Sequence, residues 1–177
     1  MSQWTKIKSI LGAASKEELV KLIGELESLS KANASFLEAR FLPSPDSIKR
    51  DKELIQKYVS PSEPWKKSQQ VNLKEARKII SNYKKASNDT LGVIELMVHY
   101  VECGTGFSRE FGDIGESYYS SMESMFDSAL ELMKKHSNNE VDNFIYRMKS
   151  IIQEARHSGY GYSDALSDML KDAYPHI

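Results

Sequence analysis

Three ionisable residues interrupt a long apolar segment near the middle of this chain. Glu95, His99 and Glu102 lie at spacings of four and three residues, which places them on one face of a helix. Because burying an unpaired charge is costly, these side chains need partners, water or a metal ion. A histidine and two carboxylates on one face could coordinate Zn²⁺ or another first-row metal ion. Cys103 follows His99 by four residues, so a thiol nucleophile beside a base is a further possibility.

A structural interpretation of the same residues is favoured. The chain lacks the paired Glu-x-x-His motifs of a di-iron helical bundle, and the C-terminal end of a helix disfavours a Cys103 thiolate. We expect the carboxylates to pair with Arg40 or Arg109, so that replacing Arg40 with alanine would break a buried ion pair. We therefore expect no metal, no cofactor and no catalytic residue. The candidate ligand-binding residues are Glu95, His99, Glu102, Arg109 and Arg40.

A glycine-rich stretch follows the apolar segment. Four glycines fall between residues 104 and 115, and glycine is common where the backbone turns or approaches another group closely. The stretch predicts that the helix stops at Gly104, that a loop follows, and that the next helix begins at Asp113 as its N-cap. Phe107 and Phe111 are expected to fill the core beneath this loop. It is not a phosphate-binding P-loop, because no Gly-Lys-Ser/Thr follows the glycines.

A basic helix face offers an alternative function. Such a face could bind phosphates, but it lacks a helix-turn-helix signature and interleaved aromatic residues. A solvated surface is therefore the simpler interpretation. The residues are Lys66, Lys67, Lys74, Arg77, Lys78 and Lys85.

Length, composition and charge narrow the class of protein. The 177 residues suit a single helical domain, 1–177, and no apolar run approaches the roughly 18 residues of a membrane span. One cysteine allows no internal disulfide. With no signal-peptide pattern at the start, we expect a cytoplasmic bacterial protein. The net charge of −1 divides into +6 over residues 1–90 and −7 over 91–177, which favours attraction between the halves during folding.

Apolar spacing and capping signals predict an all-α fold of about eight helices, packed pairwise and without a sheet. Pro43 is expected to end the second helix, Ser163 to cap the last, and Gly159 to follow the seventh. Residues 60–71 form a long internal connection that Trp65 could fix to the core. The helices are expected at about 16–30, 33–42, 46–59, from 73 onward, 89–103, 113–136, 139–157 and 163–173.

Several short motifs resemble those of a family of small bacterial helical proteins. They are Phe36-Leu37-Glu38-Ala39-Arg40-Phe41-Leu42 after a leucine-rich helix, Gly112-Asp113-Ile114 before Tyr118-Tyr119, and Gly159-Tyr160-Gly161-Tyr162. That family is a domain of unknown function, and the resemblance would cover residues 17–173. It implies a bacterial, soluble, helical protein and carries over no activity, cofactor or catalytic residue.

The sequence thus favours a non-enzymatic binding or protein-interaction module. A protein partner or a second copy of the chain is the expected partner, and a membrane is not. Nucleic-acid binding by the basic face is one alternative. A metal or small-ligand site at Glu95, His99 and Glu102 is the other.

Overall fold

A computed structural model describes residues 2–42, 44–67 and 69–176, with the side chain of Asn138 excepted. Over these residues it contains nine α-helices and one short 3₁₀-helix, and no strand, which confirms the all-α prediction. The α-helices are α1 (Gln3–Ala13), α2 (Lys16–Leu29), α3 (Lys31–Phe41), α4 (Pro45–Val59), α5 (Leu73–Ala86), α6 (Thr90–Phe111), α7 (Glu116–Met133), α8 (Asn138–Glu154) and α9 (Tyr162–Ala173), and the 3₁₀-helix is η1 (Ala155–His157).

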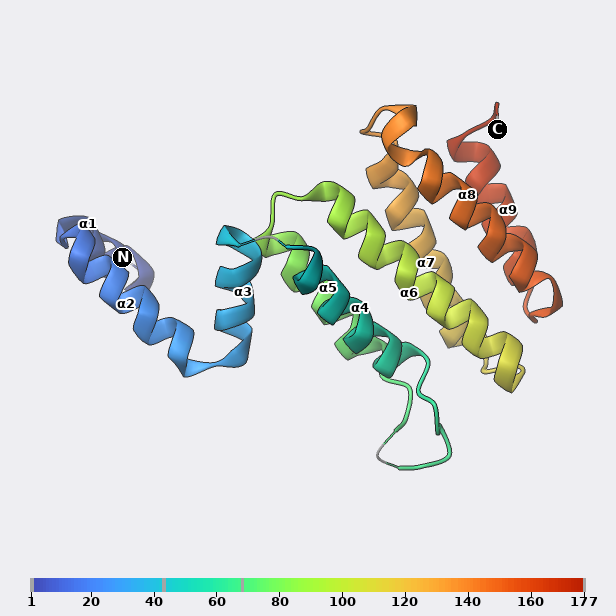
Figure 1. Ribbon diagram of the computed structural model, residues 1–177, viewed down its shortest axis with the longest axis horizontal. Coiled ribbons are helices and arrows are strands. Elements are labelled where there is room, and N and C mark those ends of the chain that lie inside the picture. The colour runs from blue at the N-terminus through green and yellow to red at the C-terminus, as the bar shows by residue number, and fades with distance from the viewer. Residues whose placement is uncertain (1, 43, 68, 177) are drawn as a thin grey trace.

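Helix α6 lies at the centre of the fold. It packs against α4 and α5 on one side and against α7 and α8 on the other, with α9 covering α7 and α8 (Figure 1). Its sequence is apolar almost all round, as expected for a helix that other helices enclose, and twelve of its residues are buried. Asp89 caps it by accepting a hydrogen bond from the Gly92 N–H at 2.8 Å.

The prediction that α6 stops at Gly104 is wrong. The helix continues for seven further residues to Phe111 and ends at Gly112, whose φ is +85°. Gly104 lies where α6 and α7 approach closely, because a Cβ there would overlap the Met122 Sδ. The glycine therefore serves helix packing, and the predicted loop is the final part of the helix, largely buried as far as Ser108 and exposed from Arg109 to Phe111. Phe107 is in the core as predicted, whereas Phe111 is 37% exposed.

Two other predicted helix boundaries are also wrong. Helix α7 begins at Glu116 with Gly115 as N-cap, while the Asp113 carboxylate accepts a hydrogen bond from the Gly115 N–H. Helix α9 begins after Gly161, and the Ser163 hydroxyl donates to the Ile152 carbonyl instead of capping. The left-handed backbone between α8 and α9 lies at Tyr160 and Gly161, not at Gly159.

The N-terminal helices form an arm that the body of the protein does not cover. Helix α1, which the apolar spacing did not predict, and helix α2 contain no buried residue. Helix α3 joins them to the body through α5, and its one buried residue is Ala39. Figure 1 shows α1–α3 extending away from α6–α9, at the opposite end of the molecule from the C-terminus.

The long connection between α4 and α5 is held at its ends. The Asn72 N–H donates to the Tyr58 carbonyl at 2.8 Å, and Pro61 is buried. Trp65 is 71% exposed, so it does not fix the connection to the core, although its ring lies 6.5 Å from that of Phe111. Two predictions, the helix stop at Pro43 and the part of the connection at Ser68, fall outside the described residues. No helix in the described part of the chain is long and apolar enough to cross a membrane.

Candidate functional site

The structure brings Glu95, His99 and Glu102 together on one face of α6, as their spacing predicted, and surrounds them with cations. The Lys52 ammonium on α4 donates to Glu95 Oε1 at 2.7 Å. Arg147 on α8 donates through Nε to Glu102 Oε1 and through Nη2 to Glu102 Oε2, both at 2.7 Å. The same guanidinium also donates through Nη1 to Glu95 Oε2. The two carboxylates therefore belong to one ion-pair network that joins α4, α6 and α8.

His99 completes this network from the side of α4. Its Nε2 donates to the Lys52 carbonyl at 3.2 Å, and its Nδ1 lies 3.8 Å from Glu102 Oε2. Glu95, His99 and Glu102 form a stripe along α6. Their side chains are 16–33% exposed, so the stripe lies at the edge of the core. In the described residues, no group of three or more His, Cys, Asp or Glu side chains is placed to hold a metal ion.

Ion pairing controls the protonation of the two carboxylates. Burial opposes ionisation of Glu102, but hydrogen bonds from Arg147 and His99 outweigh it and lower its pKa to about 2. Burial likewise opposes ionisation of Glu95, yet Arg147 and Lys52 lower its pKa below the usual value. Both groups are therefore carboxylates at neutral pH. A general acid needs a proton to give, so neither group suits that role.

Arg147 is the member of the network that the sequence analysis missed. It lies on α8 beside the buried residues Phe144 and Met148, and its guanidinium stacks on the Phe144 ring. Arg147 follows the core position Phe144 by three residues and precedes the core position Met148 by one residue. A residue so placed lies at the margin of the apolar face of its helix. That placement on α8 was the available signal.

The predicted partners, Arg40 and Arg109, lie elsewhere, and their predicted pairing with the stripe is wrong. Arg40 is exposed on α3, where it donates to the Lys85 carbonyl at 2.9 Å and lies over the Phe36 ring. Arg109 is near the end of α6 and pairs with Glu154 of α8 at 3.0 Å, with both side chains largely exposed. Both arginines lie beyond the stripe because α3 packs against α5 and Arg109 follows Glu102 by two turns.

The Cys103 thiol is unreactive in this setting. Its Sγ lies 3.4 Å from His99 Nε2, but this nitrogen carries the proton that it donates to the Lys52 carbonyl, so it has no lone pair to act as a base for the thiol. Burial and the neighbouring Glu102 carboxylate also raise the pKa of Cys103 to about 12. A thiol with this pKa is almost fully protonated at pH 7, so the arrangement does not activate sulfur.

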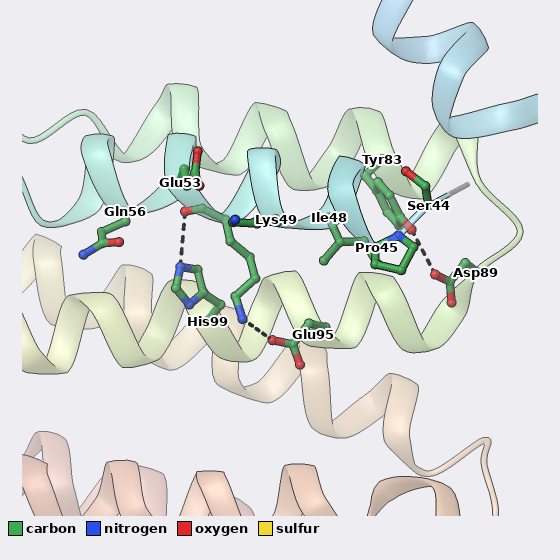
Figure 2. Close-up of a pocket in the computed structure, with 11 residues that line it drawn as sticks. Ser44, Pro45, Ile48, Lys49, Glu53, Gln56, Tyr83, Asp89, Glu95 and His99 are labelled. Atoms are coloured by element: carbon green, nitrogen blue, oxygen red, sulfur yellow. Dashed lines mark hydrogen bonds and ion pairs between the residues drawn. The ribbon is translucent and has the colours of Figure 1, made fainter. Parts of the chain in front are cut away.

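An open groove of about 700 Å³ lies between α4 and α6 (Figure 2). Glu95 and His99 reach it from α6, while Ile48, Lys49 and Glu53 approach from α4. Tyr83 closes one end by donating its hydroxyl to the Asp89 carboxylate at 2.9 Å. Because the Glu95 and His99 polar atoms already contact Lys52, the polar side chains that α6 contributes to the groove have their partners within the protein.

The basic residues do not form one free surface. Arg77 turns inward, donating to the Ser121 hydroxyl and carbonyl at 3.0 and 2.7 Å and lying over the Tyr100 ring. Lys66 pairs with Glu63, and Lys78 lies 3.7 Å from Glu75. Lys67, Lys74 and Lys85 are exposed. A phosphate-binding face would thus lose its central arginine and have acidic neighbours.

One ion pair of the described residues joins the basic and acidic halves of the chain, that of Lys52 with Glu95. Every other ion pair in the described structure lies within one half.

Comparisons with protein-family models, with curated proteins and with solved structures find no match to this chain. The resemblance to a bacterial helical family is untested by these comparisons and stays a prediction.

Proposed function

We propose that this protein is a non-enzymatic interaction protein in which α1–α3 form the partner-binding element. The observation that carries the proposal is the uncovered apolar surface of these helices. Trp4, Ile10 and Val20 are 61–72% exposed, and Leu29 is 75% exposed. Phe41 and Leu42, where α3 ends, are each 70% exposed. Single exposed apolar residues are ordinary, but many large ones gathered on one segment are typical of an interaction site.

The rest of the protein supports the same function by contrast. From α4 to α9 the apolar faces meet one another in one core cluster. The ionisable groups nearest to a plausible site, Glu95, His99 and Glu102, have partners inside the fold. Most of the exposed large apolar residues therefore lie between Trp4 and Leu42, on the arm and α3.

Isolated helices as short as α1 and α2 are marginal in water. Their 11 and 14 residues fall at or below the length at which even alanine-rich helices form alone. Burial of an amphipathic face normally supplies the missing stability, yet neither helix buries a residue within the chain. A bound partner would supply that burial.

Site-specific photo-crosslinking tests this function. A benzophenone amino acid replaces Leu26 on the arm in one variant and Tyr146 on α8, which is 74% exposed, in the matched control. Irradiation of expressing cells should give a discrete adduct from the Leu26 position, with a partner peptide identified by mass spectrometry. The Tyr146 position should give none. No adduct from either position, or the same diffuse labelling from both, would reject the arm as a partner-binding element.

A further inference from the structure

The chain exposes more surface than a compact monomer of its mass. The usual scaling gives about 8,700 Å² for a monomer of 20.1 kDa, whereas this chain exposes 11215 Å². The excess is about 2,500 Å², close to the roughly 1,000–2,500 Å² that each subunit buries in a large homodimer interface. Helices α1 and α2, which bury no residue, are where such an excess is expected.

Apolar residues form a seam along each arm helix. In α1 the steps are of three and four residues, and the seam is Trp4, Ile7 and Leu11. In α2 the steps are of three, four and three residues, and the seam is Leu19, Leu22, Leu26 and Leu29. Alternation of three and four is the a/d pattern of helices that pack side by side in bundles. Each arm thus carries two seams of the kind found in a four-helix bundle.

The two arm helices do not fill the space between their own seams. An open groove of about 400 Å³ separates them near their connection, and it is lined by Ile10, Leu11, Ala13, Ala14, Leu19 and Leu22, with Glu18 at its edge. Helices α1 and α2 are joined through Ala14 and Ser15 and make few contacts with each other, so two further helices could fill the space between their apolar faces and complete a bundle.

Charge indicates which helices these are. Helix α1 carries Lys6 and Lys8 and no acidic residue, which gives +2. Helix α2 carries Lys16 and Lys21 against Glu17, Glu18, Glu25 and Glu27, which gives −2. If the α1 and α2 helices of two copies alternate around a bundle, each α1 neighbours two α2 helices and like helices lie on the diagonals. A second copy of the chain therefore supplies a matching pair of seams with the complementary charges.

We propose that two copies of this protein associate through their α1 and α2 helices to form a four-helix bundle in which α1 and α2 alternate. The inference rests on the proposed function and names the partner of that same surface. The interface is isologous, as in most homodimers, because the same patch serves on both copies. The α4–α9 body of each copy lies outside the bundle.

Light scattering on the purified full-length protein provides the first test. At micromolar concentration the mass should be twice the 20.1 kDa of one chain. A variant with Leu22→Glu and Leu26→Glu should have the mass of one chain, while the control Tyr146→Glu on α8 should stay dimeric. The arm variant should keep the cooperative unfolding of the body, because neither leucine is buried in the monomer. A single-chain mass for the unmodified protein, or a dimer that survives both glutamates, would overturn the proposal.

A charge exchange tests the alternating arrangement and does not depend on removing apolar residues. Lys6→Glu with Lys8→Glu makes both arm helices −2, and Glu25→Lys with Glu27→Lys makes both +2. Each charge variant alone should be monomeric because like charges face one another, and an equimolar mixture should form a heterodimer with the mass of two chains. Homodimers of either variant, or a mixture that stays monomeric, would contradict the alternating bundle.

The photo-crosslinking experiment separates this proposal from the broader one. A Leu26 adduct whose partner peptide comes from a second copy of this protein supports both proposals. An adduct with a peptide from another protein, together with a monomeric mass, leaves the arm as an interaction site and overturns the homodimer. Absence of any adduct removes the proposed function itself.

Discussion

Replacing Arg147 with methionine removes the guanidinium that joins Glu95 to Glu102 while keeping a long apolar stem. The lowering of the Glu102 pKa from 4.5 to about 2 corresponds to an upper limit of about 3.4 kcal/mol. Arg147 supplies part of this, and Glu102 is a third exposed, so solvent screening reduces it further. Lys52 still compensates Glu95 in the variant. We therefore expect a loss of about 2 kcal/mol in the free energy of unfolding, or about 4–8 °C in Tm.

The loss should depend on pH in a defined direction. The folded-state pKa values of Glu95 and Glu102 lie below their ordinary values, so the stability they contribute is complete above their unfolded pKa and is lost as pH falls through the folded pKa. For Glu102 that window runs from 4.5 down to about 2. The difference between the native protein and Arg147→Met should be constant above about pH 5.5 and should shrink as pH falls to about 3.

Urea unfolding followed by circular dichroism at several pH values measures both quantities. The matched control is Arg109→Met, which removes an arginine that also pairs a glutamate between α6 and α8. There both side chains are largely exposed, so the expected loss is within about 0.5 kcal/mol. If Arg147→Met cost no more than Arg109→Met, or if its cost did not change between neutral and acidic pH, the ion-pair network would not stabilise the fold as argued.

Three other substitutions or reactions test particular contacts. Gly104→Ala should lower the free energy of unfolding by about 1–3 kcal/mol, because the new Cβ would overlap Met122. Gly106→Ala should raise it by about 0.5–1 kcal/mol, because a Cβ there meets nothing within 4 Å and alanine favours the helix. Thermal melts of the two variants compare these effects. Because the pKa of Cys103 is about 12, a thiol reagent at about pH 8 should modify the folded protein at least about 100-fold more slowly than the urea-unfolded chain. Arg40→Ala should change the free energy of unfolding by under about 0.5 kcal/mol, since Arg40 is exposed, and a larger loss in urea titration would show that its contact with Lys85 is worth more than the structure indicates.

Local signals in the sequence predicted most of the helices. Ser15 and Glu18 form a capping box, Asn72 caps α5 by accepting from the Glu75 N–H, and Asp89 caps α6. The apolar residues of α7 recur at helical spacing, and its buried residues run from Tyr118 to Met133. These signals act within a few residues of each other along the chain, which is why sequence alone reveals them.

The errors arose where the deciding contact is distant in sequence. Gly104 was interpreted as a helix stop because nothing nearby in the chain shows that Met122 packs against it. Arg147 lies 45 residues from Glu102 and 52 from Glu95, so no spacing rule connects them. The shared face of Glu95, His99 and Glu102 was predictable, but the identity of their partners depended on how α4 and α8 pack against α6.

The arm shows a different limit of sequence periodicity. The apolar residues of α2 recur as regularly as those of α8, yet α8 buries Val141, Met148 and Ile151 whereas α2 buries no residue. Helical periodicity predicts that an apolar helix face packs against another surface. It does not indicate whether that surface belongs to the same chain or to another molecule. The body closes around α6 without α1 or α2, so their apolar faces have no partner left within the chain. The same pattern that predicts a core position in α8 therefore predicts an intermolecular contact in α2, and only the completed fold distinguishes the two.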